Sequence, residues 1–220
     1  MTRIFLAGSG WFGRQAAERL IDRGHRIVGV AAPERGRRGK ADLLALWAIY
    51  GGAPLTVVST LTPEAVPEGT ELILTAHSHA FIGARTRARA PYAMGYHPSL
   101  LPLHRGRDAV RWQARMGERV VGGSIYHLTD RVDGGPLHDQ RHVVIPPGID
   151  HRHLWREYLS PIGLDMLAAA ADAVASGDVR VIPQDDRLAT WEPSFDGAPL
   201  YRPEVLQLTG TRNHQQGDNQ

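Results

Sequence analysis

Residues 3–13 read RIFLAGSGWFG, a short apolar run that ends in a turn rich in glycine. The residues that follow, from Gln15 to Ile21, carry apolar side chains at helical spacing. This stretch therefore predicts a β-strand, a tight turn and an α-helix.

The alternation of strand and helix continues beyond this first unit. An apolar run at residues 26–31 is followed by a helix-like segment at 41–50, and further apolar runs occupy 55–59 and 71–76. Because alternating strands and helices build parallel sheets with right-handed crossovers, the N-terminal half is expected to form a Rossmann-like half-sheet.

The second half of the chain follows a different pattern. Residues 120–128 and 137–145 are β-rich and are joined by a turn-forming segment, which predicts an antiparallel ribbon. Residues 151–175 carry the apolar face of a long helix that covers the sheet. The expected fold class is α/β, with a Rossmann-like, mostly parallel sheet, helices on both faces and an antiparallel ribbon in the second half.

Length and composition bound the domain organisation. The chain has 220 residues, of which 42% are hydrophobic and 22% charged, as in a soluble protein with one sizeable core. Periodicity stops near residue 181, where proline, aspartate and tryptophan become frequent. We therefore expect one domain over residues 1–185, a C-terminal extension over 186–208 and a disordered tail over 209–220.

Several classes of protein are disfavoured by composition. The chain has no cysteine, which removes disulfides, thiolate zinc sites and cysteine nucleophiles. It has no apolar run of about 20 residues and no leader-like N-terminus, so we expect a cytoplasmic protein without a membrane partner. Its 25 Lys and Arg residues are balanced by 23 Asp and Glu residues and scattered among them, which argues against nucleic-acid binding.

The glycines of residues 8–13 fit the pattern GxGxxG between the first strand and the first helix. A dinucleotide site also needs an acidic residue at the end of the second strand, but that strand runs into Ala-Ala-Pro before Glu34. The loop also carries two bulky residues, Trp11 and Phe12. A tight turn for packing is therefore favoured, and a nicotinamide oxidoreductase ranks last among the hypotheses.

Two strings in the middle of the chain carry the most specific signal. Residues 95–102 read GYHPSLLP, and residues 130–136 read DRVDGGP. Together they closely resemble the signature of the formyltetrahydrofolate-dependent formyltransferases, a family that includes glycinamide ribonucleotide transformylase, methionyl-tRNA formyltransferase and the sugar N-formyltransferases. The resemblance covers roughly residues 1–185. It implies 10-formyltetrahydrofolate as the formyl donor, a small-molecule amine as the acceptor, and a homodimer among the possible assemblies.

The resemblance also implies a catalytic centre. His97 and Asp133 match the family's histidine and aspartate, but Gly95 stands where the family has an asparagine. When an amine attacks the formyl carbon, negative charge grows on oxygen and the amine must lose a proton; His97 can stabilise the oxyanion and Asp133 can accept the proton. Because Gly95 has no side chain, we expect His77 or His79 to supply a replacement donor.

The binding residues implied by the resemblance fall into two groups. Those expected to bind the folate are His79, Ala80, Phe81, Leu100, Thr129, Asp130, Val132 and Gly135. Those expected to bind the acceptor are Gly10, Ser99, His104, Arg105 and Gly106. The short C-terminal tail argues against transfer RNA as the acceptor. Trp11 and Phe12 in the loop after the first strand argue against a purine precursor. An amino sugar, a sugar nucleotide or a specialised-metabolite amine remains.

Two alternatives stay open. His77 and His79, spaced i, i+2, could join His97 and Asp133 in the ligand set of a metal-dependent hydrolase. The missing asparagine could instead mark a non-catalytic descendant that binds folate or an amine.

Overall fold

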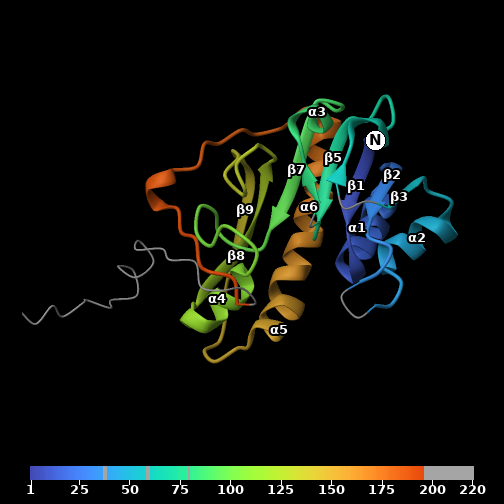
Figure 1. The fold of residues 1–220 in the computed structure, drawn as a ribbon. Helices are drawn as coiled ribbons and strands as arrows, with labels where there is room; N and C mark the ends of the chain where they lie inside the picture. Colours follow the sequence, from blue (N-terminus) through green and yellow to red (C-terminus); the bar gives the residue numbers. More distant parts are fainter. Residues whose placement is uncertain (37–38, 58–59, 79, 196–220) are drawn as a thin grey trace, which may run out of the picture.

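A seven-stranded sheet forms the centre of the molecule in the computed structural model, which describes residues 1–36, 39–57, 60–78 and 80–195 (Figure 1). Its strands, in the order β3-β2-β1-β5-β7-β8-β9, are Leu55–Val57, Arg26–Ala32, Arg3–Gly8, Leu72–Ala76, Tyr92–His97, Val120–His127 and Leu137–Val144. The first five are parallel, and β8 and β9 are antiparallel to their neighbours. Both the parallel half and the antiparallel ribbon of the sequence prediction are confirmed.

Three helices cover one face of the sheet. They are α1 (Gly10–Asp22), α2 (Leu43–Gly51) and α6 (Ser160–Ser176), and they share a core with the sheet. Helix α6 continues without a break from α5 (His151–His153) and the π-helical turn η2 (Leu154–Leu159). This run of 26 residues is apolar and long enough to cross a membrane, but half of its apolar window is buried inside the protein. Packing against the sheet accounts for its hydrophobicity.

The other face is covered by shorter pieces. Strands β4 (Thr60–Leu61) and β6 (Phe81–Ile82) pair with each other, and the turns η1 (Pro63–Ala65) and α3 (Ala84–Arg87) lie beside them. Their buried side chains pack on Phe5, Ala7 and Ile73 of the sheet. Elements this short contain no full period of a hydrophobic pattern, so the sequence did not predict them.

The glycine turn after β1 serves packing. A side chain at Gly8 would collide with the carbonyl oxygen of Ala76, and one at Gly13 would press on Leu44. The N–H group of Gly10 donates a 2.8 Å hydrogen bond to the side chain of Asp42. These contacts bring α1 close to the sheet and to α2, in agreement with the packing interpretation of the motif.

Two further elements lie beyond the carboxyl ends of the parallel strands. Helices α4 (Ala109–Met116) and α5 are found there, at the same end of the molecule (Figure 1). After α6 the chain returns past β9, forms the turn η3 (Asp186–Leu188) and reaches the loop before α4. The tail expected to be disordered lies outside the described residues.

Candidate active site

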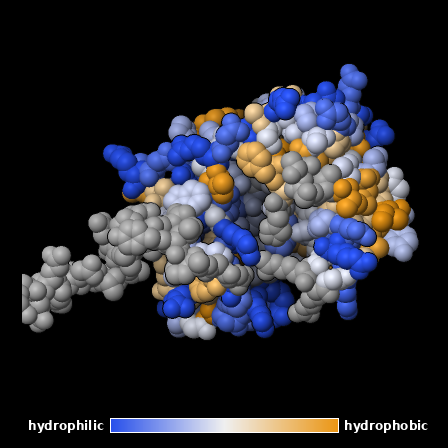
Figure 2. Space-filling view, in the orientation of Figure 1, coloured by the Kyte–Doolittle hydropathy of each residue, from blue (hydrophilic) through white to orange (hydrophobic). Residues whose placement is uncertain are grey.

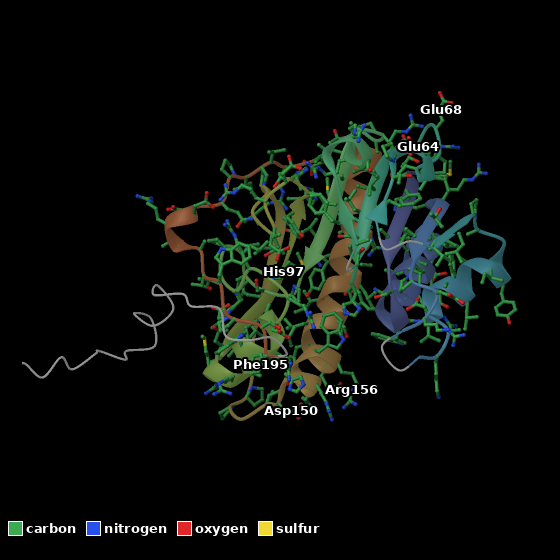
Figure 3. All side chains as sticks on the ribbon, viewed as in Figure 1. Glu64, Glu68, His97, Asp150, Arg156 and Phe195 are labelled. Carbon is green, nitrogen blue, oxygen red and sulfur yellow. The ribbon has the colours of Figure 1, made fainter. Side chains whose placement is uncertain are left out.

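His97 is the last residue of β7 and lies near the middle of the molecule, on the side of α4 and α5 (Figure 3). Its Nε2 atom is 2.7 Å from the carbonyl oxygen of His104. Because a carbonyl only accepts hydrogen bonds, Nε2 carries a proton and Nδ1 is the nitrogen that faces Asp133, 3.5 Å from Oδ2. Nδ1 can therefore accept a proton when the ring is neutral and donate one when it is charged.

Asp133 is held from three sides. Its Oδ2 accepts a 2.8 Å hydrogen bond from the N–H of Gly106, and its Oδ1 accepts a 2.7 Å bond from the hydroxyl of Tyr126. Its own carbonyl accepts a bond from Gln184. The backbone of Asp133 is left-handed, with φ of 49°, a conformation that aspartate tolerates better than most residues. These contacts fix the carboxylate beside the imidazole of His97.

Tyr126 is a site residue that sequence reasoning missed. Burial raises the pKa of its hydroxyl well above the ordinary value, and the negative charge of Asp133 raises that pKa further. Tyr126 therefore stays protonated and acts as the donor to Asp133. Its position in β8 gave no signal, because an aromatic residue in a strand is most often part of the core.

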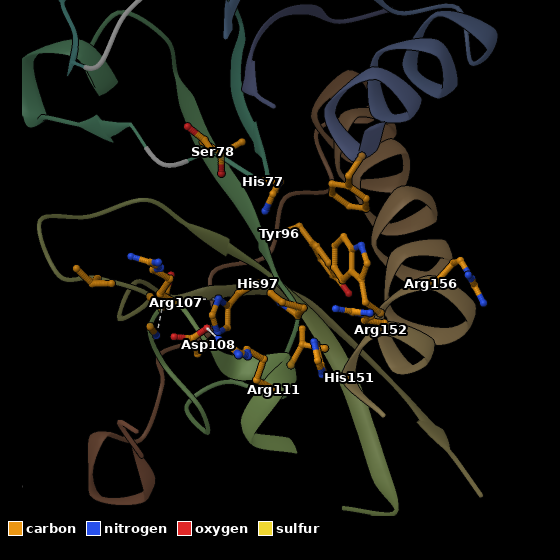
Figure 4. A pocket seen from close by; sticks show the side chains of 18 of the residues that line it. His77, Ser78, Tyr96, His97, Arg107, Asp108, Arg111, His151, Arg152 and Arg156 are labelled. Carbon is orange, nitrogen blue, oxygen red and sulfur yellow. Dashed lines mark hydrogen bonds and ion pairs between the residues drawn. The ribbon is translucent and has the colours of Figure 1, made fainter. Parts of the chain in front are cut away.

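A large cavity of about 1020 Å³ opens in front of His97. Figure 2 shows the surface hollowed at this place, and Figure 4 shows the side chains that converge on it. Four of the lining residues are arginines, whereas only Asp108 and Asp133 are acidic. The arginines are Arg107, Arg111, Arg152 and Arg156. The lining therefore carries more positively charged than negatively charged side chains.

A small cavity of about 250 Å³ adjoins the large one. The residues that line both cavities, here called the shared wall, are Thr75, Ser78, Tyr126, Val132 and Asp133. Asp133 can therefore reach a group bound in either cavity. Such a site can bring together two ligands that exchange a group.

Comparison with known proteins places this geometry in a family. Residues 60–160 match the family model described as formyl transferase. Human mitochondrial 10-formyltetrahydrofolate dehydrogenase is 30% identical over 207 residues, which cover 86% of this chain and 22% of that protein. Methionyl-tRNA formyltransferase from Roseiflexus castenholzii is 31% identical over 201 residues, which cover 86% of this chain and 64% of that protein.

The chain contains a formyl transferase domain. It spans only 22% of the human dehydrogenase, so that protein's full activity is not carried over. A solved N-formyltransferase from Helicobacter canadensis, in complex with folinic acid and dTDP-3-aminofucose, has the same fold. The TM-score is 0.72 at 14% identity, and the match covers 90% of this chain and 73% of that one.

Within the formyl transferase domain, four of the residues expected to bind folate line the small cavity. They are Ala80, Phe81, Thr129 and Val132. Leu100, Asp130 and Gly135 line neither cavity, and His79 lies outside the described residues. Asp130 instead pairs with Arg87 at 2.8 Å, and Gly135 packs tightly against the carbonyl of His127.

Four of the five residues expected to bind the acceptor line neither cavity, and their assignment stays a prediction. Gly10 donates to Asp42, as described above, and does not line the large cavity. Ser99 is fully buried, and its hydroxyl donates a 2.6 Å bond to the carbonyl of Leu103. His104 and Arg105 are also buried and bind other protein groups. Of these five residues, only Gly106 lines the large cavity. Proximity to His97 in the sequence does not determine whether a loop residue points into the cavity.

His104 and Arg105 connect the His97 loop to the C-terminal segment. The imidazole of His104 lies between the carboxylates of Glu118, at 2.6 Å, and Glu192, at 3.1 Å. Burial disfavours the charged ring, but the hydrogen bonds and charges of the two glutamates outweigh it and raise the pKa of His104 to about 9. Arg105 binds Gln184 and Asp186. Both residues therefore hold the loop after His97 in place without lining a cavity.

His77 does line the large cavity, as Figure 4 shows. Its Nδ1 is 3.2 Å from the hydroxyl of Ser9, and its ring lies 6.3 Å from that of Trp155. Among the described residues no group of three or more histidines and carboxylates could hold a metal ion. The hydrolase alternative therefore gains no support from the described part of the site.

Proposed function

We propose that this domain transfers the formyl group of 10-formyltetrahydrofolate to the amine of a small, anionic acceptor such as an amino-sugar nucleotide. The observation that carries the proposal is the position of Asp133, in the wall shared by the two cavities and 3.5 Å from His97. The small cavity suits the formyl donor, and the large cavity suits the acceptor. The reacting groups then meet at His97 and Asp133.

The chemistry of transfer matches the two side chains. An attacking amine becomes positively charged as its nitrogen bonds to the formyl carbon, and it must lose a proton. The carboxylate of Asp133 can accept that proton, directly or through water. Nε2 of His97 is occupied by the carbonyl of His104, so Nδ1 is the nitrogen that can exchange a proton with the amine or with Asp133.

The donor side of the proposal rests on the small cavity. Phe81, Val132 and Leu128 offer apolar surface to a flat ring, while Thr129 and Ser78 offer polar atoms at its edge. Two comparisons support a folate as the formyl donor. The human relative is named for 10-formyltetrahydrofolate, and the Helicobacter structure contains folinic acid.

The acceptor side rests on the charge of the large cavity. In Figure 4 the side chain of Arg152 extends from its helix toward His97, whereas Arg156 extends away from it. Guanidinium groups bind phosphate oxygens with paired hydrogen bonds. The rings of Trp11, Phe12 and Trp155 add flat surfaces on which a sugar or base can stack. An acceptor that carries phosphate fits these features better than a neutral amine.

Calorimetry tests whether the two cavities take these two ligands. We expect 5-formyltetrahydrofolate, a form of the donor with its formyl group on another nitrogen, to bind at micromolar concentrations. Phe81→Ala should weaken folate binding about tenfold and leave an amino-sugar nucleotide unaffected. Arg152→Ala should weaken binding of the amino-sugar nucleotide about 10- to 100-fold, because it removes a charge-assisted hydrogen bond, and should leave folate binding unaffected.

A matched control is Arg14→Ala. Arg14 lies on α1 in an exposed ion pair with Glu18 and lines neither cavity. Its removal should change neither affinity. Absence of folate binding at high micromolar concentration would count heavily against the proposal, and equal losses from Phe81→Ala on both ligands would contradict the division of the cavities.

A further inference from the structure

Three neighbouring strands place Thr75, Gly95 and Tyr126 in one row across the sheet. Thr75 of β5 pairs with Gly95 of β7, and Gly95 pairs with Tyr126 of β8. Paired residues point to the same face of a sheet, and so does His97, two residues after Gly95. The row therefore lies on the face that carries His97.

The space beside Gly95 is already filled. A Cβ atom built on Gly95 would overlap the hydroxyl oxygen of Thr75. It would also lie 3.3 Å from a methyl group of Leu128 and 3.4 Å from the ring of Tyr126. Gly95 therefore leaves room for the Thr75 hydroxyl. A side chain at position 95 would displace Thr75 from its present position.

As far as the described residues show, the hydroxyl of Thr75 is available for a hydrogen bond. Thr75 belongs to the shared wall, and no hydrogen bond of its side chain is found in the part of the chain that the structure describes. Its neighbours in that wall are more constrained. Tyr126 donates to Asp133, and the oxygen of Ser78 accepts a bond from the N–H of Ala80 in the loop after β5.

We propose that the Thr75 hydroxyl donates a hydrogen bond to the formyl oxygen as negative charge develops on it, a role that rests on the proposed function. The amine nitrogen forms a bond to the formyl carbon, and the C=O π electrons move to the oxygen that Thr75 stabilises. When that pair re-forms the carbonyl, the bond from carbon to N10 of the folate breaks. The proton lost by the amine passes to Asp133 and from there, directly or through water, to N10, which keeps the electron pair of the broken bond, so Asp133 ends the cycle as a carboxylate.

This assignment differs from the one expected from the sequence. His77 or His79 was expected to supply the donor that Gly95 lacks; Nδ1 of His77 faces the hydroxyl of Ser9, and His79 lies outside the described residues. Thr75 is instead adjacent to Gly95 itself and occupies the volume where a side chain at that position would begin. A hydroxyl from β5 thus takes the place of a side chain from β7.

Steady-state kinetics of two variants test the role. Thr75→Val keeps the shape of the side chain and removes the hydroxyl, so kcat should fall about 10²–10³-fold, the usual cost of one oxyanion donor. The Kd for 5-formyltetrahydrofolate should stay within about tenfold, because the bond forms mainly in the transition state. Thr75→Ser retains the hydroxyl and should keep kcat within about tenfold of the unaltered protein.

The control is Thr56→Val, the same chemical change in strand β3, where Thr56 lines neither cavity. It should leave kcat unchanged. Unaltered kcat in Thr75→Val, or a loss confined to folate affinity, would overturn the role of Thr75 while the proposed function stands. If the unaltered protein forms no formylated amine, the proposed function fails and this role fails with it.

Discussion

At the scale of single residues, other groups of the protein already hold the side chains of His97 and Asp133 by hydrogen bonds. The carbonyl of His104 fixes the proton on Nε2 of His97, and Tyr126 and Gly106 hold the two oxygens of Asp133. Groups held in this way need little reorganisation when charge develops during a reaction. The orientation of the pair is therefore a property of the folded protein, established before any ligand binds.

The overlap between position 95 and Thr75 gives a prediction about stability. Gly95→Asn should lower the free energy of unfolding by about 1–3 kcal/mol, as overpacking of a filled site does. Thr75→Gly should remove the clash, so the double variant should be more stable than the sum of the two single changes predicts. Urea denaturation of all four proteins measures this coupling. Additive losses would show that the two positions do not compete for space.

Sequence alone could predict His97 and Asp133 as site residues, because each lies within a contiguous string that resembles a known family. It could not identify Thr75 or Tyr126. Their proximity to Gly95 depends on the register of three strands that are separated along the chain. The same limit explains Ser99 and His104, which lie close to His97 in sequence but are buried behind it.

At the scale of elements, the C-terminal segment supports the loop after His97. The N–H groups of His104 and Arg105 donate to the side chain and the carbonyl of Thr190, respectively, and Thr190 donates from its own N–H to Pro102. The segment set apart as an extension by its composition is thus bonded, as far as residue 195, to the loop after His97 and to α4. Most of these bonds use main-chain groups of the segment, so its side chains carry no periodic pattern that the sequence could reveal.

The imidazolium of His104 should make stability depend on pH. Its pKa is raised from 6.5 to about 9, so its contribution is complete below pH 6.5 and is lost as the pH rises through 9. The free energy of unfolding should therefore fall over this range, by an amount on the order of 3 kcal/mol from this residue. Urea denaturation at a series of pH values measures it.

His104→Gln should flatten this part of the pH profile. The exposed His153 provides a control, and His153→Gln should leave the slope unchanged. A slope that is the same in His104→Gln and in the unaltered protein would show that Glu118 and Glu192 do not hold a charged ring between them.

At the scale of the whole molecule, the sheet brings together segments that are far apart along the chain. The alternation of strands and helices predicted the parallel half, and β8 and β9 followed from their β-rich composition. Part of the lining of the small cavity was predicted, but the division into two cavities was not, because they are formed by loops and helix ends that meet only in the folded chain. The cytoplasmic location and the homodimer stay predictions.

The central claim is that formyl transfer takes place at His97 and Asp133. Its most direct test is mass spectrometry of an amino-sugar nucleotide after incubation with 10-formyltetrahydrofolate and the protein. We predict an N-formylated product, formed about 10²–10⁴-fold more slowly by His97→Ala and by Asp133→Asn, with folate affinity within about tenfold in both. Asparagine suits the variant because it tolerates the left-handed backbone of Asp133. Folate binding without formylation of any amine, or near-normal rates in both variants, would contradict the claim.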